Sequence, residues 1–418
     1  MVKKIPFGDS TLYAIDGEFL LDGKEYYCKD GYLFTASKCK NDEAIRRAIE
    51  YYGTENLTSI HPTFVFNENG ELDCCFAKIK TLTTISDVFL DPPSNANMPT
   101  YVTLSACIGR FTSLETLEIR NSIVYFIHNN FKKLPNLREV MIAFGGDVIP
   151  SALTEADISY ALQISAPYAG SFESEFKCYR IARLLIAADT QQVHHSIGNL
   201  TNLEALAIYN DVATTIPSSI RNCRKLTHLS IGMDNLVQIP SWLAYLENLS
   251  YISIQSDKIT QIADPICNIR SLKNIELYFC GSLTSIPDCI GKLSALEQLN
   301  VLFCRKITQV PETIGDLRSL RVLAIAGCNI DRLPESLGAL SKLELLSLYT
   351  SSISSLPDSI GGLESIKLVN LAYTKISVLP ESFFSLKTLK FLDIQGTKMS
   401  PEYVNYIKER MPWVSVSY

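Results

Sequence analysis

Long apolar runs and concentrated charge are both missing from this sequence. No apolar segment of the 418 residues approaches the roughly 18 to 20 residues that cross a bilayer, so we do not expect a membrane protein. Charged residues make up 20%, and 44 acidic against 38 basic residues give a net charge of −6. Nucleic-acid binding needs a concentrated basic surface, so this composition argues against it.

Motifs of catalysis, metal binding and export are also absent. The sequence contains no CxxC, HExxH, GxSxG, GxGxxG or GxxxxGK[ST] pattern, and its first residues lack the apolar segment of a signal peptide. The 12 cysteines fit neither a zinc ribbon nor a disulfide scaffold. We therefore assign no catalytic residue, metal ligand or cofactor, and we expect reduced thiols in a cytoplasmic protein.

Apolar residues, in contrast, make up 47% of the chain and recur with a long period. The pattern LxxLxL returns every 23 or 24 residues, and its clear starting positions are Leu203, Leu226, Leu249, Leu272, Leu296, Leu320, Leu343, Ile366 and Leu389. Between these strands a second segment recurs as LPxxIGxL, with its proline at Pro217, Pro240, Pro287, Pro311, Pro334, Pro357 and Pro380. A fixed period of this length is the signature of a solenoid.

Weaker repeats extend the pattern toward the amino terminus. Leu114, Leu137 and Ile181 begin further LxxLxL segments. For the interval 144–180 a degenerate repeat around Leu162 and Ile164 is favoured over a functional insertion. We expect thirteen or fourteen consecutive coils.

Over residues 76–399 these repeats resemble the leucine-rich repeat family, in the form of its intracellular bacterial and plant members. The resemblance implies an α/β solenoid, in which parallel strands line a concave face and the proline segments form the convex side. Such an array needs capped ends. Within residues 400–418, Ser400 as N-cap and Pro401 predict a capping helix, and a final strand is expected around Trp413–Val416.

Residues 1–75 lack the repeat and are predicted to form a small α+β unit, which either caps the array or has an activity of its own. Asp-Gly dipeptides separate short β-like runs up to residue 35, a pattern typical of a meander. Residues 41–53 predict a helix, and residues 61–76 predict a hairpin.

The ninth position of each coil, where the family places asparagine, holds small polar residues here. Cys280, Cys304 and Cys328 are predicted to be buried and to hydrogen bond with the backbone. The same column holds three carboxylates, at Asp211, Asp234 and Asp257. They are expected either as solvated turn residues or as stacked ligands of a divalent cation.

Aromatic residues are frequent at positions predicted to point out of the concave face. They are Tyr209, Tyr251, Tyr278, Phe279, Phe303, Tyr349 and Tyr373. Single apolar residues are common on protein surfaces, but clustering on consecutive coils favours a binding surface. We predict that these residues form a protein-binding site on a monomer.

Two functions remain open from the sequence. In the first, the protein is an interaction module, located in the cytoplasm, that binds a partner protein on the concave face. In the second, it is an effector of bacterial type, delivered to a host cytosol, whose amino-terminal unit has an enzymatic activity such as that of a ubiquitin ligase. The lack of a catalytic motif favours the first.

Overall fold

The computed structural model describes residues 3–7, 10–14, 17–21, 24–29, 32–35, 59–66, 72, 76–77, 82–86, 101–144, 161–166, 182–188, 192–193, 195–262 and 264–418. Contacts divide the chain into two compact units. The amino-terminal unit comprises Met1–Tyr168 with Glu173–Leu185, and the carboxy-terminal unit comprises Ala169–Phe172 with Ile186–Tyr418.

The chain begins with two small antiparallel sheets. Strands β1 (Lys3–Phe7) and β2 (Ser10–Ala14) pair with each other. Strands β3 (Gly17–Leu21), β4 (Lys24–Lys29) and β5 (Tyr32–Thr35) form the second sheet in sequence order. The predicted meander is confirmed, whereas the helix predicted at 41–53 lies outside the described residues.

The amino-terminal unit also contains parallel strands. These are β6 (Ser59–Ile60), β7 (Thr84–Ile85), β8 (Tyr101–Leu104), β9 (Thr116–Ile127), β10 (Glu139–Phe144) and β11 (Ala161–Ala166). Strand β6 pairs with β7, β7 with β9, β8 with β9, and β9 with β10. Parallel pairing therefore begins upstream of residue 76, where the array was predicted to start.

Two details of this unit differ from the sequence prediction. The hairpin predicted at 61–76 is wrong in its first half, because Pro62–Val65 form the short helix α2 and one antiparallel bridge, Phe66 to Leu72, follows. Proline opens a helix readily, since the first turn needs no N–H donor there. The degenerate coil is confirmed, because β11 pairs in parallel with β10 and places Leu162 opposite Val140.

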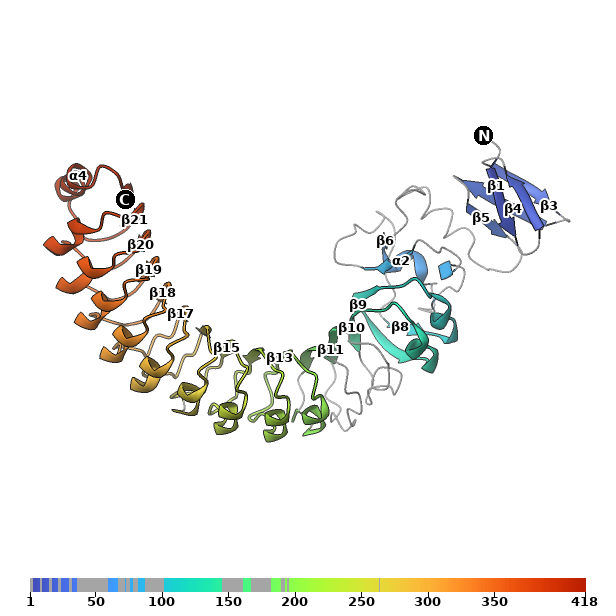
Figure 1. Cartoon of the computed structure of the whole chain (residues 1–418), viewed down its shortest axis with the longest axis horizontal. Helices are drawn as coiled ribbons and strands as arrows, with labels where there is room; N and C mark the ends of the chain where they lie inside the picture. Colours follow the sequence, from blue (N-terminus) through green and yellow to red (C-terminus); the bar gives the residue numbers. More distant parts are fainter. Residues whose placement is uncertain are drawn as a thin grey trace. The chain divides into compact units, whose positions relative to one another are not determined.

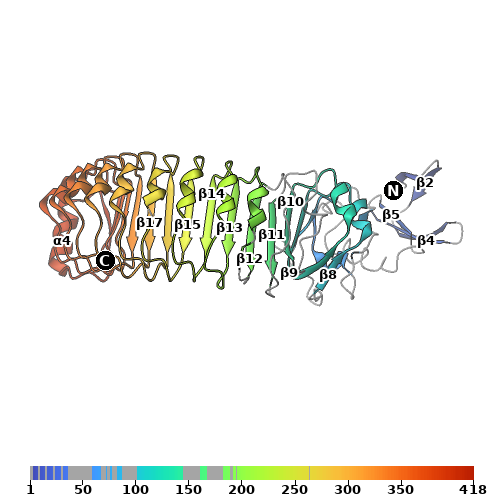
Figure 2. The same cartoon turned by 90° about the horizontal axis from the view of Figure 1, so that it is seen from below.

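The carboxy-terminal unit is a regular solenoid. Its strands are β13 (Ala205–Tyr209), β14 (His228–Gly232), β15 (Tyr251–Gln255), β16 (Asn274–Tyr278), β17 (Gln298–Leu302), β18 (Val322–Ala326), β19 (Leu345–Ser347), β20 (Leu368–Asn370) and β21 (Phe391–Asp393). Strand β12 (Arg183–Ala188) precedes them. Figure 2 shows the strands side by side, and Figure 1 shows this unit as an arc with the strands on its inner side.

Alternation of apolar and other residues holds the strands in place. Leu229, Ile252 and Ile275 are opposite one another on β14, β15 and β16, and each is almost fully buried. The residues between them point to the concave face, because successive side chains of a strand point to opposite sides. A shift by one residue would expose every aliphatic side chain, so the hydrophobic pattern fixes the pairing.

Five-residue 3₁₀ turns form the convex side. In the carboxy-terminal unit they are η5 (His195–Asn199), η6 (Ser218–Asn222), η7 (Ser241–Tyr245), η8 (Asp264–Asn268), η9 (Asp288–Lys292), η10 (Glu312–Asp316), η11 (Glu335–Ala339), η12 (Asp358–Gly362) and η13 (Glu381–Ser385). Each of the seven repeated prolines is the N-cap of such a turn, with φ between −65° and −71°. The proline ring prefers this φ, and its missing N–H interrupts no ladder there.

The last coil is covered by helix α4 (Pro401–Arg410). The Ser400 hydroxyl accepts a hydrogen bond from the Tyr403 N–H, and Pro401 occupies the first turn, as the sequence predicted. Strand β22 (Ser415–Ser417) pairs in parallel with β21 and overlaps the predicted strand, beginning two residues later and ending one residue later. Val404 and Ile407 of α4 are buried, so the helix closes the apolar end of the stack.

In three coils the ninth position is not the buried one, and its carboxylates lie in turns as the first of the two alternatives predicted. Asp211 and Asp257 are exposed and Asp234 is half-buried, while the preceding residues Asn210, Met233 and Ser256 are buried. From the coil at Leu272 to the coil at Ile366 the eighth residue has a positive φ, and burial moves to the ninth position. Cys280, Cys304 and Cys328 are buried there as predicted.

The three cysteines link neighbouring coils. Their thiols donate to backbone carbonyls of the preceding coil: Cys280 to Ile254 at 3.6 Å, Cys304 to Leu277 at 3.7 Å and Cys328 to Val301 at 3.5 Å. Hydrogen bonding with Cys304 and burial raise the pKa of Cys280. A buried protonated thiol is a poor nucleophile. Hydrogen bonding with Cys304 lowers the pKa of Cys328, so for that thiol burial alone protects against reagents.

We expect the three thiols to react slowly with thiol reagents in the native state. Cys304→Ala should lower the free energy of unfolding by about 1–2 kcal/mol, because it removes a buried contact and a hydrogen bond. Labelling followed by mass spectrometry measures the first effect and urea denaturation measures the second. Rapid native labelling of all three would contradict the buried column.

Cys267 and Cys289 form a disulfide, which contradicts the prediction that the thiols are reduced. Their Cα atoms are 5.7 Å apart, within the ordinary range for disulfides. The bond joins η8 to η9 on neighbouring coils. The expectation of a cytoplasmic protein rested in part on reduced cysteines and loses that support.

Candidate functional site

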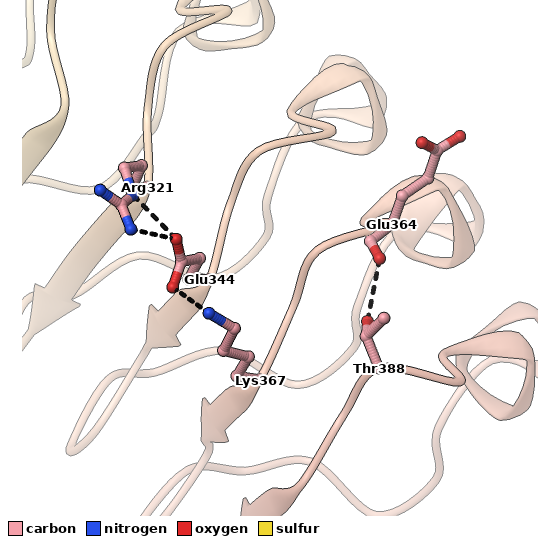
Figure 3. A network of polar contacts seen from close by, with 5 residues as sticks. All are labelled: Arg321, Glu344, Glu364, Lys367 and Thr388. Atoms are coloured by element: carbon pink, nitrogen blue, oxygen red, sulfur yellow. Dashed lines mark hydrogen bonds and ion pairs between the residues drawn. The ribbon is translucent and has the colours of Figure 1, made fainter.

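The concave face of the carboxy-terminal unit is almost free of charge. The outward positions of β13–β21 include neither lysine nor arginine, and their carboxylates are Glu276 and Asp393. Charges gather beside the strand starts and pair there. Arg321 Nε donates to Glu344 at 2.8 Å, and Lys367 Nζ donates to the other oxygen of that carboxylate at 2.6 Å (Figure 3).

This network links successive coils at the edge of the concave face. Further along it, the Thr388 hydroxyl donates to the Glu364 carbonyl at 3.0 Å (Figure 3). A hollow next to these residues is lined by Lys367, Lys387, Lys390 and Trp413 among others. The Lys387 ammonium lies 4.4 Å from the centre of the Trp413 ring. Exposed pairs of this kind contribute little to stability.

The predicted aromatic residues do not form one cluster. Phe279 and Phe303 stack in parallel with ring centres 5.1 Å apart, and Tyr349 and Tyr373 meet edge to face at 5.7 Å. The coil between these pairs contributes Gly327. We call Phe279, Phe303, Tyr349 and Tyr373 the aromatic ridge.

Three residues of the aromatic ridge have an unusual backbone conformation. Phe279, Phe303 and Tyr373 have φ values of 49°, 58° and 57°, in the left-handed region that disfavours bulky side chains. They occupy the extra turn position that Gly327 and Gly396 fill in other coils, also at positive φ. Their side chains point to the surface, where Phe279 is 53% and Tyr373 57% exposed.

Glycines leave room for these rings. A Cβ on Gly327 would lie 2.5 Å from the Phe303 ring, and a Cβ on Gly396 would lie 2.7 Å from the Tyr373 ring. Tyr209, which is three coils from the aromatic ridge, lies against Gly232 in the same way. Each ring therefore covers the backbone of the next coil and presents its outer face to solvent.

The other predicted tyrosines belong to a polar group on the strands. Tyr251 stacks on His228 with ring centres 5.6 Å apart, and its hydroxyl donates to Glu276. Asn300 Nδ2 donates to the second oxygen of Glu276 at 3.4 Å. Tyr278 is two residues after Glu276 on β16 and points to the same side.

The two tyrosines of this group stay protonated. Burial and the hydrogen bond to Glu276 raise the pKa of Tyr251 to about 12. Burial and the nearby negative charge of Glu276 also raise the pKa of Tyr278. Sequence reasoning selected the tyrosines for their size but missed Glu276, His228 and Asn300. The signal was available, since Glu276 is the one charged residue in its column between Ala207 and Asn370.

The described residues offer no cluster of three histidine, cysteine or carboxylate side chains that could hold a metal ion. Asp211, Asp234 and Asp257, considered as stacked cation ligands, lie in the turns next to the buried column. Among the described residues the α-helices are four and ten residues long, and none is long and apolar enough to cross a bilayer.

No family model matches this chain, and no curated protein matches it either. Solved structures do. A leucine-rich repeat protein of Leptospira interrogans is 18% identical, with a TM-score of 0.57 over 84% of this chain and 93% of that chain. TLR13, solved with the single-stranded RNA ssRNA13, is 17% identical, with a TM-score of 0.59 over 88% of this chain and 63% of that chain.

A plant receptor gives a third likeness. The ectodomain of the receptor kinase GASSHO1/SCHENGEN3 from Arabidopsis thaliana, solved with Casparian strip integrity factor 2, is 19% identical, with a TM-score of 0.53 over 84% of this chain and 42% of that chain. Identities this low carry information on the fold alone. With the sequence repeats, the parallel strands and the 3₁₀ turns, they show that this chain has the leucine-rich-repeat fold.

Proposed function

We propose that the carboxy-terminal unit binds a partner protein on its concave face, with the aromatic ridge as the main contact. The observation that carries this proposal is the left-handed backbone at Phe279 and Phe303, whose side chains are exposed. A bulky residue in that conformation costs about 1–3 kcal/mol, and glycine would avoid most of the cost. The stacking of the two rings recovers about 0.5–1.5 kcal/mol at most.

Exposed aromatic rings on a rigid frame are good protein anchors. They bring a large apolar contact area and lose few rotamers on binding. The solenoid holds both phenyl rings in fixed positions, because each lies at the end of a hydrogen-bonded strand. These features favour a protein surface as the partner.

The chemistry of the face argues against nucleic acid. The related fold of TLR13 was solved with RNA. Phosphate groups need lysine or arginine, and the outward positions of β13–β21 in this chain have neither. The plant ectodomain was solved with a named factor, Casparian strip integrity factor 2. A face without lysine or arginine fits a protein partner better than a nucleic acid.

The test is a quantitative pull-down with Phe279→Ala/Phe303→Ala against the unchanged chain. Truncation of an aromatic anchor costs about 2 kcal/mol or more, so the double variant should weaken capture by at least about 30-fold. The matched control is Val237→Ala/Val378→Ala, which removes two exposed apolar side chains away from the aromatic ridge.

Each variant is first checked for an unchanged urea midpoint. The proposal requires a captured protein that the phenylalanine variant loses and the valine variant keeps. If both variants still capture the protein, the binding site does not lie on the aromatic ridge.

A further inference from the structure

Glu276 is a negative charge without a cationic partner. Its two oxygens accept hydrogen bonds from Tyr251 and Asn300, which are both neutral donors. Among the described residues, no lysine, arginine or histidine lies within ion-pair distance of it. The nearby Lys273, three residues earlier, is paired with Glu297 at 3.2 Å.

The position of this carboxylate is unusual for the surface around it. Glu276 is half-buried near the middle of a face on which the outward positions of β13–β20 hold no other lysine, arginine, aspartate or glutamate. Desolvating a carboxylate is costly unless it is paired, and two neutral hydrogen bonds replace part of its hydration. A carboxylate can accept about four hydrogen bonds, so acceptor sites remain open toward solvent.

Two aromatic rings flank the carboxylate. Tyr278 follows it by two residues on β16, and Tyr251 reaches it from β15, where Ser253 is directly opposite Glu276. Both phenols are neutral at neutral pH, and the raised pKa of each keeps it neutral at higher pH as well. Aromatic faces next to a carboxylate attract a cation through both the ring quadrupole and the full charge.

We propose that Glu276, with Tyr251 and Tyr278, binds a lysine or arginine side chain of the partner protein. This inference rests on the proposed function, because the aromatic ridge begins at Phe279, next to Tyr278. The aromatic ridge gives affinity, and the carboxylate selects partners with a positive charge beside their apolar contact. The face presents the carboxylate of Glu276 and has no lysine or arginine at its outward positions, so a basic side chain of the partner would be complementary in charge.

The experiment is a selection from a display library of random peptides against the immobilised full chain. Peptides selected by the unchanged protein should be enriched in lysine or arginine next to apolar residues. Binding of the best peptide should fall about tenfold or more with Glu276→Gln, which keeps the hydrogen-bond acceptor for Tyr251 but removes the charge.

The matched control is Glu297→Gln, since Glu297 is already paired with Lys273 and should not affect peptide binding. A second variant reverses the charge: Glu276→Arg should select peptides enriched in aspartate or glutamate. This gain of a new preference cannot result from loss of folding.

The outcomes separate the inference from the proposed function. One outcome would overturn the role of Glu276 alone. In it, the selected peptides lose binding with Phe279→Ala/Phe303→Ala, show no enrichment in lysine or arginine, and bind Glu276→Gln as well as the unchanged chain. Peptides that bind the phenylalanine variant unchanged, or no selected peptides at all, would overturn the proposed function and the inference together.

Discussion

Reduction of the Cys267–Cys289 disulfide is expected to lower the free energy of unfolding of the carboxy-terminal unit by about 3 kcal/mol. The bond closes a loop with a sequence separation of 22 residues, and the chain-entropy model gives this magnitude for loops of that length. It also ties two neighbouring coils together. In a solenoid the contacts between neighbouring coils contribute much of the stability. Breaking the disulfide therefore weakens one of these contacts directly.

The measurement is urea denaturation followed by tryptophan fluorescence. The chain has two tryptophans, Trp242 and Trp413, and both belong to the carboxy-terminal unit, so the signal reports this unit alone. Reductant should lower the midpoint of the unchanged chain. Cys289→Ser should show the lower midpoint from the start and no further response to reductant.

A digest under non-reducing conditions should yield the peptide pair joined through Cys267 and Cys289. Equal midpoints with and without reductant, in a protein whose digest shows the joined peptides, would mean that the bond contributes no stability.

The regular part of the fold could be predicted from sequence because each signal is local. The leucine pattern fixes which side of a strand is buried, and the seven repeated prolines mark where seven of the 3₁₀ turns begin. Ser400 and Pro401 fixed the start of α4 for the same reason. These signals need no knowledge of the neighbouring coil.

Contacts between coils were harder to predict. Cys267 occupies the glycine position of LPxxIGxL, and Cys289 occupies the position that holds serine or threonine in several other coils. Elsewhere the glycine of one coil packs against that serine or threonine of the next. Alignment of neighbouring coils would have shown the pair. A search for short CxxC spacings could not, because the two cysteines are about one coil apart.

The aromatic ridge shows a second limit of sequence reasoning. Phe279 and Phe303 were predicted to continue the concave face of their strands, but both lie in a turn with positive φ. The 24-residue length of the coils at Leu272 and Leu296 was the available signal for an extra turn residue. Nothing in the repeat pattern predicts aromatic residues at a position with positive φ, where glycine has a lower conformational energy.

Gly338→Ala is expected to destabilise the carboxy-terminal unit by about 3 kcal/mol, at the upper end for an overpacked site. A Cβ at Gly338 would lie 2.2 Å from the Ser359 carbonyl oxygen and 2.7 Å from the Ser359 Cβ, so the backbones of η11 and η12 would have to separate. The matched control is Gly281→Ala, whose Cβ would meet a carboxylate oxygen of exposed Asp257 at 3.0 Å, which can rotate away. Its free energy of unfolding, measured by urea denaturation with tryptophan fluorescence, should change by less than about 0.5 kcal/mol. If both variants unfold at the same urea concentration, close approach of neighbouring 3₁₀ turns is not what requires glycine in LPxxIGxL.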